Sequence, residues 1–175
     1  MLRLGPLRLH WSLLLGAVLF CAAQPGLLLL AGYALVLAAH VAGHAIATAG
    51  APLRVEGVML HALGGELLGT GEVAPVRRSL IAVCGVAAQA LLLGAALFLP
   101  LPGDLHEALT RRNGVMLLLN LIPVKPLDGA LAWKLPQRLR AARRLKFRGE
   151  MRSSRQVQQD VSDLLRKIRG NSRVR

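Results

Sequence analysis

The chain has 175 residues, of which 54% are hydrophobic and only 3% aromatic, and its formal net charge is +13. A water-soluble domain of this length does not need so much apolar surface, and here the apolar residues are clustered in long runs. The composition therefore excludes an ordinary soluble domain. Cys21 and Cys84 both lie in apolar runs and predict no disulfide framework.

The first apolar segment, residues 9–23, is short for a helix that crosses a membrane. It follows Arg3 and Arg8 and ends in small residues near Ala23, so one alternative is a signal peptide in which residues 1–23 are removed. The turn sequence Gln-Pro-Gly that follows leads directly into the next apolar run, as in a helical hairpin. We therefore expect this segment to be a retained first span.

Two longer apolar runs follow it. Residues 27–50 and 79–99 contain no Asp, Glu, Lys or Arg, and each exceeds the roughly 20 residues that a helix needs to cross a bilayer. Both runs predict transmembrane helices. Between them, residues 53–73 alternate short apolar stretches with glycines, which predicts small strands or a hairpin.

The last apolar segment, residues 114–133, is interrupted. Pro123 and Pro126 break its helical pattern, and Lys125 and Asp128 place charges inside it. Charged groups and non-helical backbone at membrane depth are tolerated only where protein or a water-filled cavity covers them. The interruption therefore marks a functional site within a fourth predicted span.

Basic residues predict the orientation of the chain. Fourteen of the 22 Lys and Arg residues lie in residues 134–175, and three more lie in the loop of residues 51–78. Because positive residues stay cytoplasmic, we expect both termini to be cytoplasmic. Arg111 and Arg112 fall on the outer side in this scheme and count against it.

The predicted fold class is an all-α membrane protein with about four transmembrane helices. A small β-hairpin-like middle loop and a basic helical cytoplasmic tail complete it. The domain organisation that follows is a membrane-embedded domain of residues 1–135 and a tail of residues 136–175.

Two histidines, His40 and His44, lie inside the first long apolar run. Positions i and i+4 of a helix share one face, so both imidazoles point the same way. Two neutral imidazoles so placed can bind one tetrahedral zinc ion. The alternative is that each histidine hydrogen-bonds to a neighbouring helix. Haem is disfavoured, because its two axial ligands must approach from opposite faces of the macrocycle.

A third ligand is available in Asp128, in the interrupted segment. Pro123 and Pro126 disrupt the helix before it, and Gly129 permits unusual backbone angles after it. A carboxylate at membrane depth is costly unless it meets a cation. Zinc is one such cation and Lys125 is the other, although three residues of non-helical backbone make a poor pairing geometry for the lysine.

The motifs of this site resemble those of the site-2 protease family of intramembrane zinc metalloproteases, in particular the small branch typified by the bacterial sporulation-factor processing protease. NLIPVKPLDG, residues 120–129, is similar to the family's Asn-Leu-Leu-Pro…Pro-Leu-Asp-Gly signature, and HVAGH, residues 40–44, stands where the family has His-Glu-x-x-His. The resemblance covers residues 1–135. It implies that His40, His44 and Asp128 are the zinc ligands.

Other segments resemble the family less closely. Residues 7–12 resemble its opening span, and residues 60–68 resemble a Gly-Gly strand element close to the active site. Residues 77–89 resemble a segment that usually reads Ala-Gly-Pro-x-x-Asn, although Val86 replaces the proline and Gln89 the asparagine. The residues expected to shape the cleft around the metal are Gly85, Gln89, Asn120, Pro126 and Gly129.

Val41 occupies the position of the family's glutamate, which accepts a proton from the attacking water. Valine has no proton acceptor, and loss of a general base typically costs ~10²–10⁴ in rate. One of the carboxylates of the middle loop, Glu56, Glu66 or Glu72, is an alternative base, but no pattern in the sequence favours it. No catalytic residue is therefore predicted.

Three hypotheses follow from these residues. The preferred one is a pseudoprotease that keeps the scaffold and zinc and binds or scaffolds a membrane partner. The second is an active intramembrane zinc metalloprotease with a displaced base. The third is a structural subunit of a larger membrane complex in which the metal site is vestigial.

Two regions are predicted to bind partners. The strand element at Gly64 and Gly65 can pair with an extended partner segment by edge addition. The basic residues 136–148 attract anionic lipid head groups by ~1 kcal/mol each, and their juxtamembrane position disfavours nucleic acid as the ligand. A helical stripe that can dock on another protein, on the membrane surface or on a second copy of the chain comprises Val157, Val161, Leu164, Leu165 and Ile168.

Overall fold

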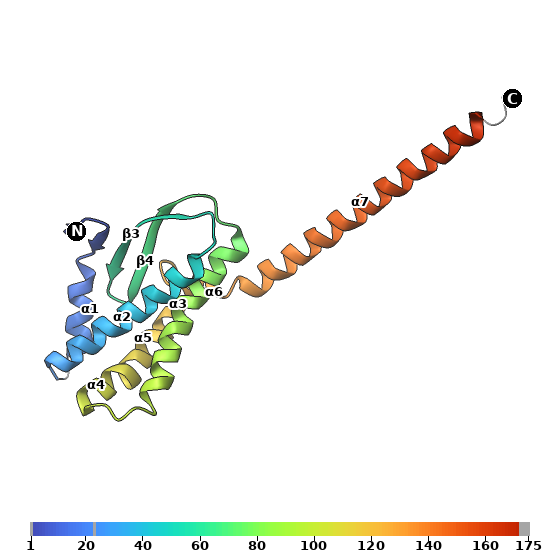
Figure 1. Ribbon diagram of the computed structural model, residues 1–175. Helices are drawn as coiled ribbons and strands as arrows, with labels where there is room; N and C mark the ends of the chain where they lie inside the picture. The colour runs from blue at the N-terminus through green and yellow to red at the C-terminus, as the bar shows by residue number, and fades with distance from the viewer. Residues whose placement is uncertain (1, 23, 172–175) are drawn as a thin grey trace. The chain divides into compact units, whose positions relative to one another are not determined.

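A computed structural model describes residues 2–22 and 24–171, with side chains beyond Arg148 described only at residues 156, 158, 159, 161 and 162. The chain divides into two compact units, residues 1–135 and 136–175. The first unit contains the sheet and helices α1–α6, and the second contains the long helix α7 (Figure 1).

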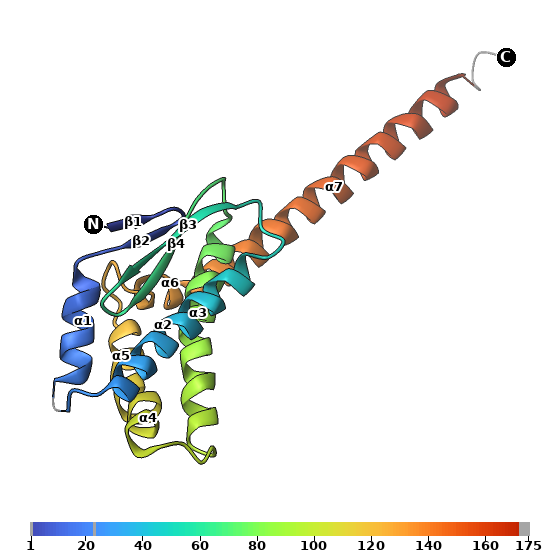
Figure 2. The ribbon, with the colours of Figure 1, turned by 60° about the vertical axis from the view of Figure 1, so that its left-hand side comes forward.

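The first unit contains a four-stranded sheet in the order β1-β2-β3-β4 (Figure 2). Its strands are β1 (Leu2–Leu4), β2 (Leu7–Leu9), β3 (Arg54–His61) and β4 (Gly64–Thr70). The β2–β3 pair is parallel and the other two pairs are antiparallel. The predicted hairpin of residues 53–73 is therefore β3 and β4, but the expectation of an all-α fold is corrected by the sheet.

The N-terminal strands are the part of this sheet that the sequence analysis missed. Two Leu-Arg-Leu triplets flank Gly5 and Pro6, and Gly5 adopts a φ of 62°, a left-handed conformation that favours glycine. Leu2 pairs with Leu9 and Leu4 with Leu7 across this turn. The triplets are too short to form a stable hairpin alone, so the pairing of β2 with β3 is what retains them in the sheet.

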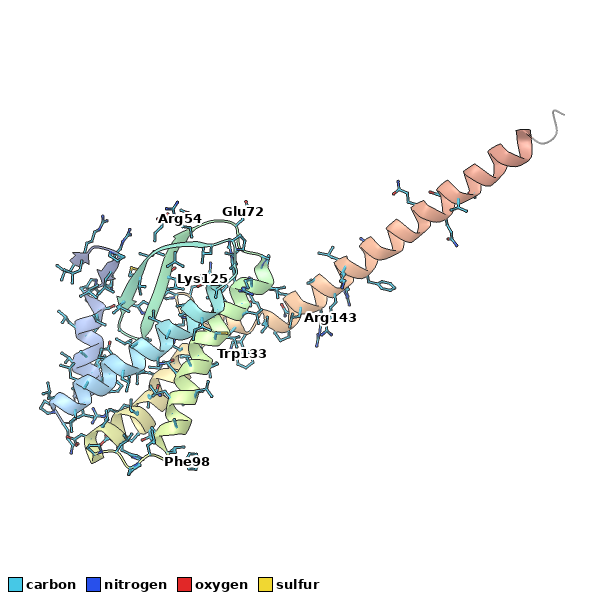
Figure 3. All side chains as sticks on the ribbon, in the orientation of Figure 1. Arg54, Glu72, Phe98, Lys125, Trp133 and Arg143 are labelled. Carbon is cyan, nitrogen blue, oxygen red and sulfur yellow. The ribbon has the colours of Figure 1, made fainter. Side chains whose placement is uncertain are left out.

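Two helices are long and apolar enough to cross a membrane: α2 (Leu27–Thr48) and α3 (Pro75–Ala96). Large apolar side chains point outward from both, including Leu27 at 83% exposed and Leu91 at 74%. Phe98, just beyond α3, is 89% exposed (Figure 3). Together with their length, this outward apolar surface supports a membrane protein, because lipid is the solvent in which such a surface is stable.

The other two predicted spans are not single long helices in the described residues. Helix α1 (Ser12–Cys21) has 10 residues, and α5 (Asn113–Asn120) has 8 before the chain leaves helical geometry. The next short helix, α6, covers Gly129–Ala132. The count of four transmembrane helices is therefore not confirmed.

The helical run that ends in α5 starts earlier than the sequence predicts. It comprises α4 (Gly103–Glu107), a π-helical turn η1 (Ala108–Arg112) and α5. Arg112 Nη2 lies 3.0 Å from Glu107 Oε1, and its Nε donates to the same oxygen at 3.1 Å. These residues are five apart, which suits the wider π turn, and the pair accounts for an arginine predicted on the outer side of the membrane.

Helices α2 and α3 pack closely because small residues line their contact. A Cβ at Gly43 would meet the backbone carbonyl of Cys84 and, at 2.8 Å, the Cβ of Ala88. Close approach of backbones through small residues is the usual way in which helices associate in lipid. The core beside this contact comprises Phe20, Leu29, Tyr33, Val36, Leu37, Ala96, Ala108, Leu109 and Met116.

The second unit is one helix, α7 (Leu135–Asn171), of 37 residues. The basic residues 136–148 and the predicted apolar stripe thus belong to a single helix. Of the stripe, the structure describes the side chain of Val161, which is 50% exposed. The side chains of Val157, Leu164 and Ile168 lie outside the described residues.

Candidate metal centre

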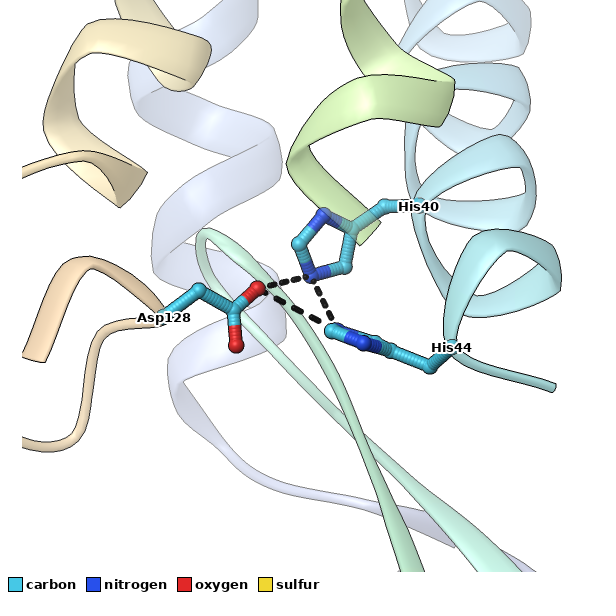
Figure 4. A group of neighbouring side chains, drawn as sticks. All are labelled: His40, His44 and Asp128. Atoms are coloured by element: carbon cyan, nitrogen blue, oxygen red, sulfur yellow. Dashed lines mark hydrogen bonds and ion pairs between the residues drawn. The ribbon is translucent and has the colours of Figure 1, made fainter. Parts of the chain in front are cut away.

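Helix α2 presents His40 and His44 one turn apart on its buried side. Their exposed fractions are 2% and 4%, and the two Nε2 atoms lie 2.9 Å apart (Figure 4). The ring planes are nearly perpendicular, at 89°. The i, i+4 spacing of the helix therefore brings two imidazole nitrogens to a common point.

The other nitrogen of each imidazole is engaged with a neighbouring helix. His44 Nδ1 lies 2.8 Å from the backbone oxygen of Ile81, which can only accept, so Nδ1 carries the proton and donates it. His40 Nδ1 lies 3.2 Å from Gln89 Oε1. The alternative reading, in which each histidine simply bonds to a neighbouring helix, thus describes the Nδ1 atoms and leaves the Nε2 atoms to be explained.

Asn120 fixes the donor and acceptor roles around His40. Its Nδ2 donates to the carbonyl of Leu63 at 2.8 Å and to Gln89 Oε1 at 3.2 Å. The Leu63 carbonyl sets the orientation of the Asn120 amide, which in turn sets the orientation of the Gln89 amide. His40 Nδ1 is consequently the donor to Gln89 Oε1, and both Nε2 atoms present lone pairs to the site.

Asp128 completes the group from the opposite side. Its Oδ2 lies 3.1 Å from His40 Nε2 and 3.2 Å from His44 Nε2 (Figure 4). The segment that carries it turns back after α5, and Gly129 packs so closely that a Cβ there would meet the carbonyl oxygens of Leu121 and Ile122. Lys125, the other predicted partner of Asp128, is exposed.

These three ligand atoms fit a divalent metal ion. With both Nδ1 atoms protonated, Asp128 Oδ2 and the two Nε2 atoms are all acceptors, and the buried Oδ2 has no hydrogen-bond partner among the described residues. A cation placed between them stabilises three converging lone pairs. Ligands of a tetrahedral zinc site lie about 3.3 Å apart, close to the 2.9–3.2 Å found here. The group could therefore hold a metal ion.

Glycines give the metal group its room. A Cβ at Gly64 would lie 2.8 Å from His40 Nε2, and a Cβ at Gly85 would lie 2.6 Å from His44 Nε2. A Cβ at Gly65 would meet the side chain of Val41. Gly64 and Gly65, predicted from the sequence to contact a partner, are buried against α2, and Gly85, predicted to shape the cleft, borders His44.

Val41 and the acidic residues of the middle region provide no carboxylate inside the group. Val41 is half-buried against Gly65, Glu56 accepts a hydrogen bond from Thr70 at 2.9 Å, and Glu72 is exposed. Glu66 is also exposed, although its charge acts on His44.

His61, at the end of β3, is the residue that sequence analysis passed over. It is half-buried and pairs with Gly64 across the β3–β4 turn. Burial lowers the pKa of His61 below its usual value, the neighbouring His40 lowers it further, and the carboxylate of Asp128 opposes the shift. The signal that could have found it is the two-residue spacing of HALG, which pairs His61 with the first glycine of the Gly-Gly element.

Comparison with known proteins supports the fold of this site. Among solved structures, the chain is similar to the Site-2 Protease from Methanocaldococcus jannaschii, with 19% sequence identity and a TM-score of 0.57 over 77% of this chain and 68% of that chain. This chain has the site-2 protease fold. No protein-family model and no curated protein matches the chain. The structural similarity is therefore evidence for the fold, and the site geometry is evidence of a separate kind.

Proposed function

We propose that this chain is a membrane-embedded member of the site-2 protease family that holds zinc through His40, His44 and Asp128. The observation that carries the proposal is the convergence of three acceptor atoms on one point, with the far nitrogen of each imidazole already engaged. The shared fold and the two apolar helices support it. We place the protein in a bacterial inner membrane with both termini cytoplasmic.

Bound zinc acts as a Lewis acid toward a carbonyl oxygen and makes water easier to deprotonate. The residues of this chain hold and orient the site: Gln89 and the Ile81 carbonyl fix the two imidazoles by accepting from Nδ1, which also makes the ligands more basic. Gly64 and Gly85 leave the space beside the two Nε2 atoms open.

The same geometry supports a protein that binds a partner more readily than it cuts one. Val41 lacks a proton acceptor, and its absence costs ~10²–10⁴ in rate. Strand β4 lies at the end of the sheet order and has no further strand beside it among the described residues. An extended segment of a membrane protein can add to that edge through main-chain hydrogen bonds. We therefore propose a pseudoprotease whose peptide hydrolysis is absent or slow.

Metal content tests the proposal directly. The purified protein should contain about one zinc ion per chain, and Asp128→Ala should lose it because two imidazoles alone leave zinc half-coordinated. Asp104→Ala, which removes an exposed carboxylate on α4, is the matched control and should retain zinc. A wild-type protein free of zinc that co-purifies with other membrane subunits would support the structural-subunit hypothesis instead.

Cleavage assays separate the pseudoprotease from an active enzyme. The wild-type protein in proteoliposomes should cleave a transmembrane test substrate slowly or not at all. Rapid zinc-dependent cleavage that is lost in His44→Ala would establish the active-protease hypothesis. The second candidate is worth this test because the half-buried His61 imidazole lies on the side of the sheet that faces His40.

We propose further that the tail binds anionic lipid. The segment of α7 from 136 to 148 carries six Lys and Arg residues and no acidic residue, and each basic residue near a membrane surface contributes ~1 kcal/mol. In a full-length variant whose six basic residues are replaced by neutral ones, a smaller fraction of molecules should adopt the wild-type orientation in phosphatidylserine vesicles. The same fraction should match wild type in phosphatidylcholine vesicles. We do not expect the tail to bind nucleic acid. Chemical cross-linking of the full-length protein tests whether the apolar stripe that includes Val161 joins two copies of the chain.

A further inference from the structure

The end of the β3–β4 hairpin brings a third histidine toward the metal group. His61 and Gly64 are paired across the antiparallel ladder. Paired residues project from the same face of a sheet, with Cβ positions about 4.5–5.5 Å apart. The direction of the Cβ missing from Gly64 therefore also gives the direction of the His61 side chain.

That direction leads to His40. A Cβ at Gly64 would lie 2.8 Å from His40 Nε2, so the His61 Cβ lies within roughly 8 Å of that nitrogen. An imidazole is long enough to span much of this separation. The ionisable groups that affect His61 agree with this placement, because they are His40, Asp128, His44 and, from the N-terminal segment, His10.

His61 does not complete the ligand set itself. Among the described residues, the ligand atoms that lie within 4.8 Å of one another belong to His40, His44 and Asp128. A group held just outside that set is in the right place to contact a water molecule in the site. A half-buried imidazole in its neutral form has one nitrogen free to accept a proton.

The hairpin turn that carries His61 is held in place by three helices or their ends. Tyr33 donates to the carbonyl of Ala62 at 2.8 Å, and Asn120 donates to the carbonyl of Leu63 at 2.8 Å. The amide of Ala62 donates to Ser12 Oγ at 3.3 Å. A group positioned by a fixed turn loses little freedom when it acts, which is a requirement for a proton acceptor.

We propose that His61 accepts the proton of the water in the metal site, in place of the carboxylate that is missing at position 41. The inference rests on the metal-holding function proposed above. It assigns the proton acceptor for any peptide hydrolysis that the site performs. The water oxygen forms a bond to the peptide carbonyl carbon while its proton moves to a ring nitrogen of His61. The same proton then passes to the amine nitrogen as the C–N bond breaks, which leaves a carboxylic acid and an amine.

Glu66 is the rival acceptor. Its partner in the ladder is Met59, and Glu66 lies two residues beyond Gly64, so it projects from the same face. It is exposed, however, and lies one full strand repeat farther from the turn. Glu66→Gln is therefore the matched control.

The test uses full-length protein loaded with cobalt(II), whose visible spectrum reports the ionisation of water at the metal. Wild type, His61→Gln and Glu66→Gln should bind equal amounts of cobalt. The pH midpoint of the spectral transition should fall by about one unit in His61→Gln, since His61 accepts a hydrogen bond that the un-ionised water donates and so favours that form. The midpoint should change less in Glu66→Gln, which removes an exposed charge. Cobalt binding with an unchanged midpoint in His61→Gln, or an equal or larger shift in Glu66→Gln, would overturn the inference alone.

A double substitution gives a second readout. Slow hydrolysis by the native chain should fall about 100-fold in His61→Gln. In a Val41→Glu background the carboxylate provides another acceptor, so His61→Gln should have a much smaller effect there. Equal effects in both backgrounds would show that His61 acts structurally and would contradict the assignment. Failure of the wild-type protein to bind cobalt or zinc would overturn the metal-holding function and the inference together.

Discussion

Helix α2 and the segment between α5 and α6 both contribute side chains to the group of His40, His44 and Asp128, but they do so with opposite kinds of backbone. Helix α2 runs unbroken for 22 residues, and its regular spacing alone aligns His40 with His44. Asp128 reaches the same point only because the chain leaves helical geometry after Asn120 and returns to it at Gly129. The regular helix aligns its two histidines through spacing alone, whereas the irregular segment depends on single residues to place Asp128.

The irregular segment keeps its backbone polar groups satisfied with short turns. The amide of Val124 donates to Ile122 at 2.8 Å, and the amide of Leu127 donates to Val124 at 2.9 Å. The indole Nε1 of Trp133 donates to the carbonyl of Leu121 at 2.8 Å. Pro126 has no amide hydrogen, so it leaves no donor unpaired. Non-helical backbone is stable in such surroundings only with this degree of pairing.

The largest expected effect comes from Gly129→Ala. The added Cβ meets the carbonyl oxygens of Leu121 and Ile122, which are backbone atoms and cannot move aside, so the turn that carries Asp128 must open. Zinc content should fall to background, and overpacking should lower stability by about 1–3 kcal/mol. Metal analysis and thermal denaturation of detergent-purified protein measure both. Gly114→Ala, whose Cβ would make an ordinary 3.5 Å contact with Leu93, should behave like wild type.

A smaller effect is expected when the helical side is disturbed. Gly85→Ala places a Cβ 2.6 Å from His44 Nε2, and the ring can rotate away because it is the end of a side chain. Zinc affinity should fall about 100-fold, within the range seen when ligand orientation is lost, while stability changes little. Competition with a metal chelator measures the affinity. Gly94→Ala on the same helix meets nothing within 4 Å; an equal loss in that variant would contradict this account.

Removal of the acceptor behind His40 sharpens the comparison further. Gln89→Met keeps the side chain's volume but removes the Oε1 atom that accepts from His40 Nδ1 and Asn120 Nδ2. Zinc affinity should fall about 10-fold. The same chelator competition applies. Unchanged affinity in a folded Gln89→Met protein would show that His40 is oriented by packing alone.

The smallest predicted effect is on stability without loss of metal. Tyr33→Phe removes the hydrogen bond to the carbonyl of Ala62 at 2.8 Å, which is worth about 1 kcal/mol. The thermal midpoint should fall slightly while zinc content stays at the wild-type value, because Asn120 still holds the turn through Leu63. A large loss of zinc in Tyr33→Phe would show that the turn depends on this single bond.

The sequence predicts the arrangement of the site residues where helical periodicity determines the direction of their side chains. The four-residue spacing of His40 and His44 is sufficient to align them, and Asp128 followed from the cost of a lone carboxylate in an apolar segment. His61 could not be assigned in this way, because its direction depends on the pairing with Gly64 and on which face of the sheet meets α2. Alternation along a strand divides its residues between two faces, but it does not identify the face on which His61 meets the metal group.

The fold was predicted less completely than the site for a similar reason. Hydrophobic runs identify α2 and α3 well, since length and composition decide whether a helix can cross a membrane. They do not show that the segment around Ser12 forms a 10-residue helix after two short strands, because those strands are held by β3, which lies more than 40 residues away in sequence. Likewise, the pair of Glu107 and Arg112 depends on a π turn that periodicity does not reveal.

The Asn120 amide donates to the Leu63 carbonyl at the tip of the hairpin and to Gln89 Oε1. The same Gln89 oxygen accepts a hydrogen bond from His40 Nδ1. On the proposal that a peptide pairs with β4, its binding at the hairpin would reach the His40 imidazole through these two amide side chains. The strand edge and the proposed metal site are thus connected by a continuous chain of hydrogen bonds.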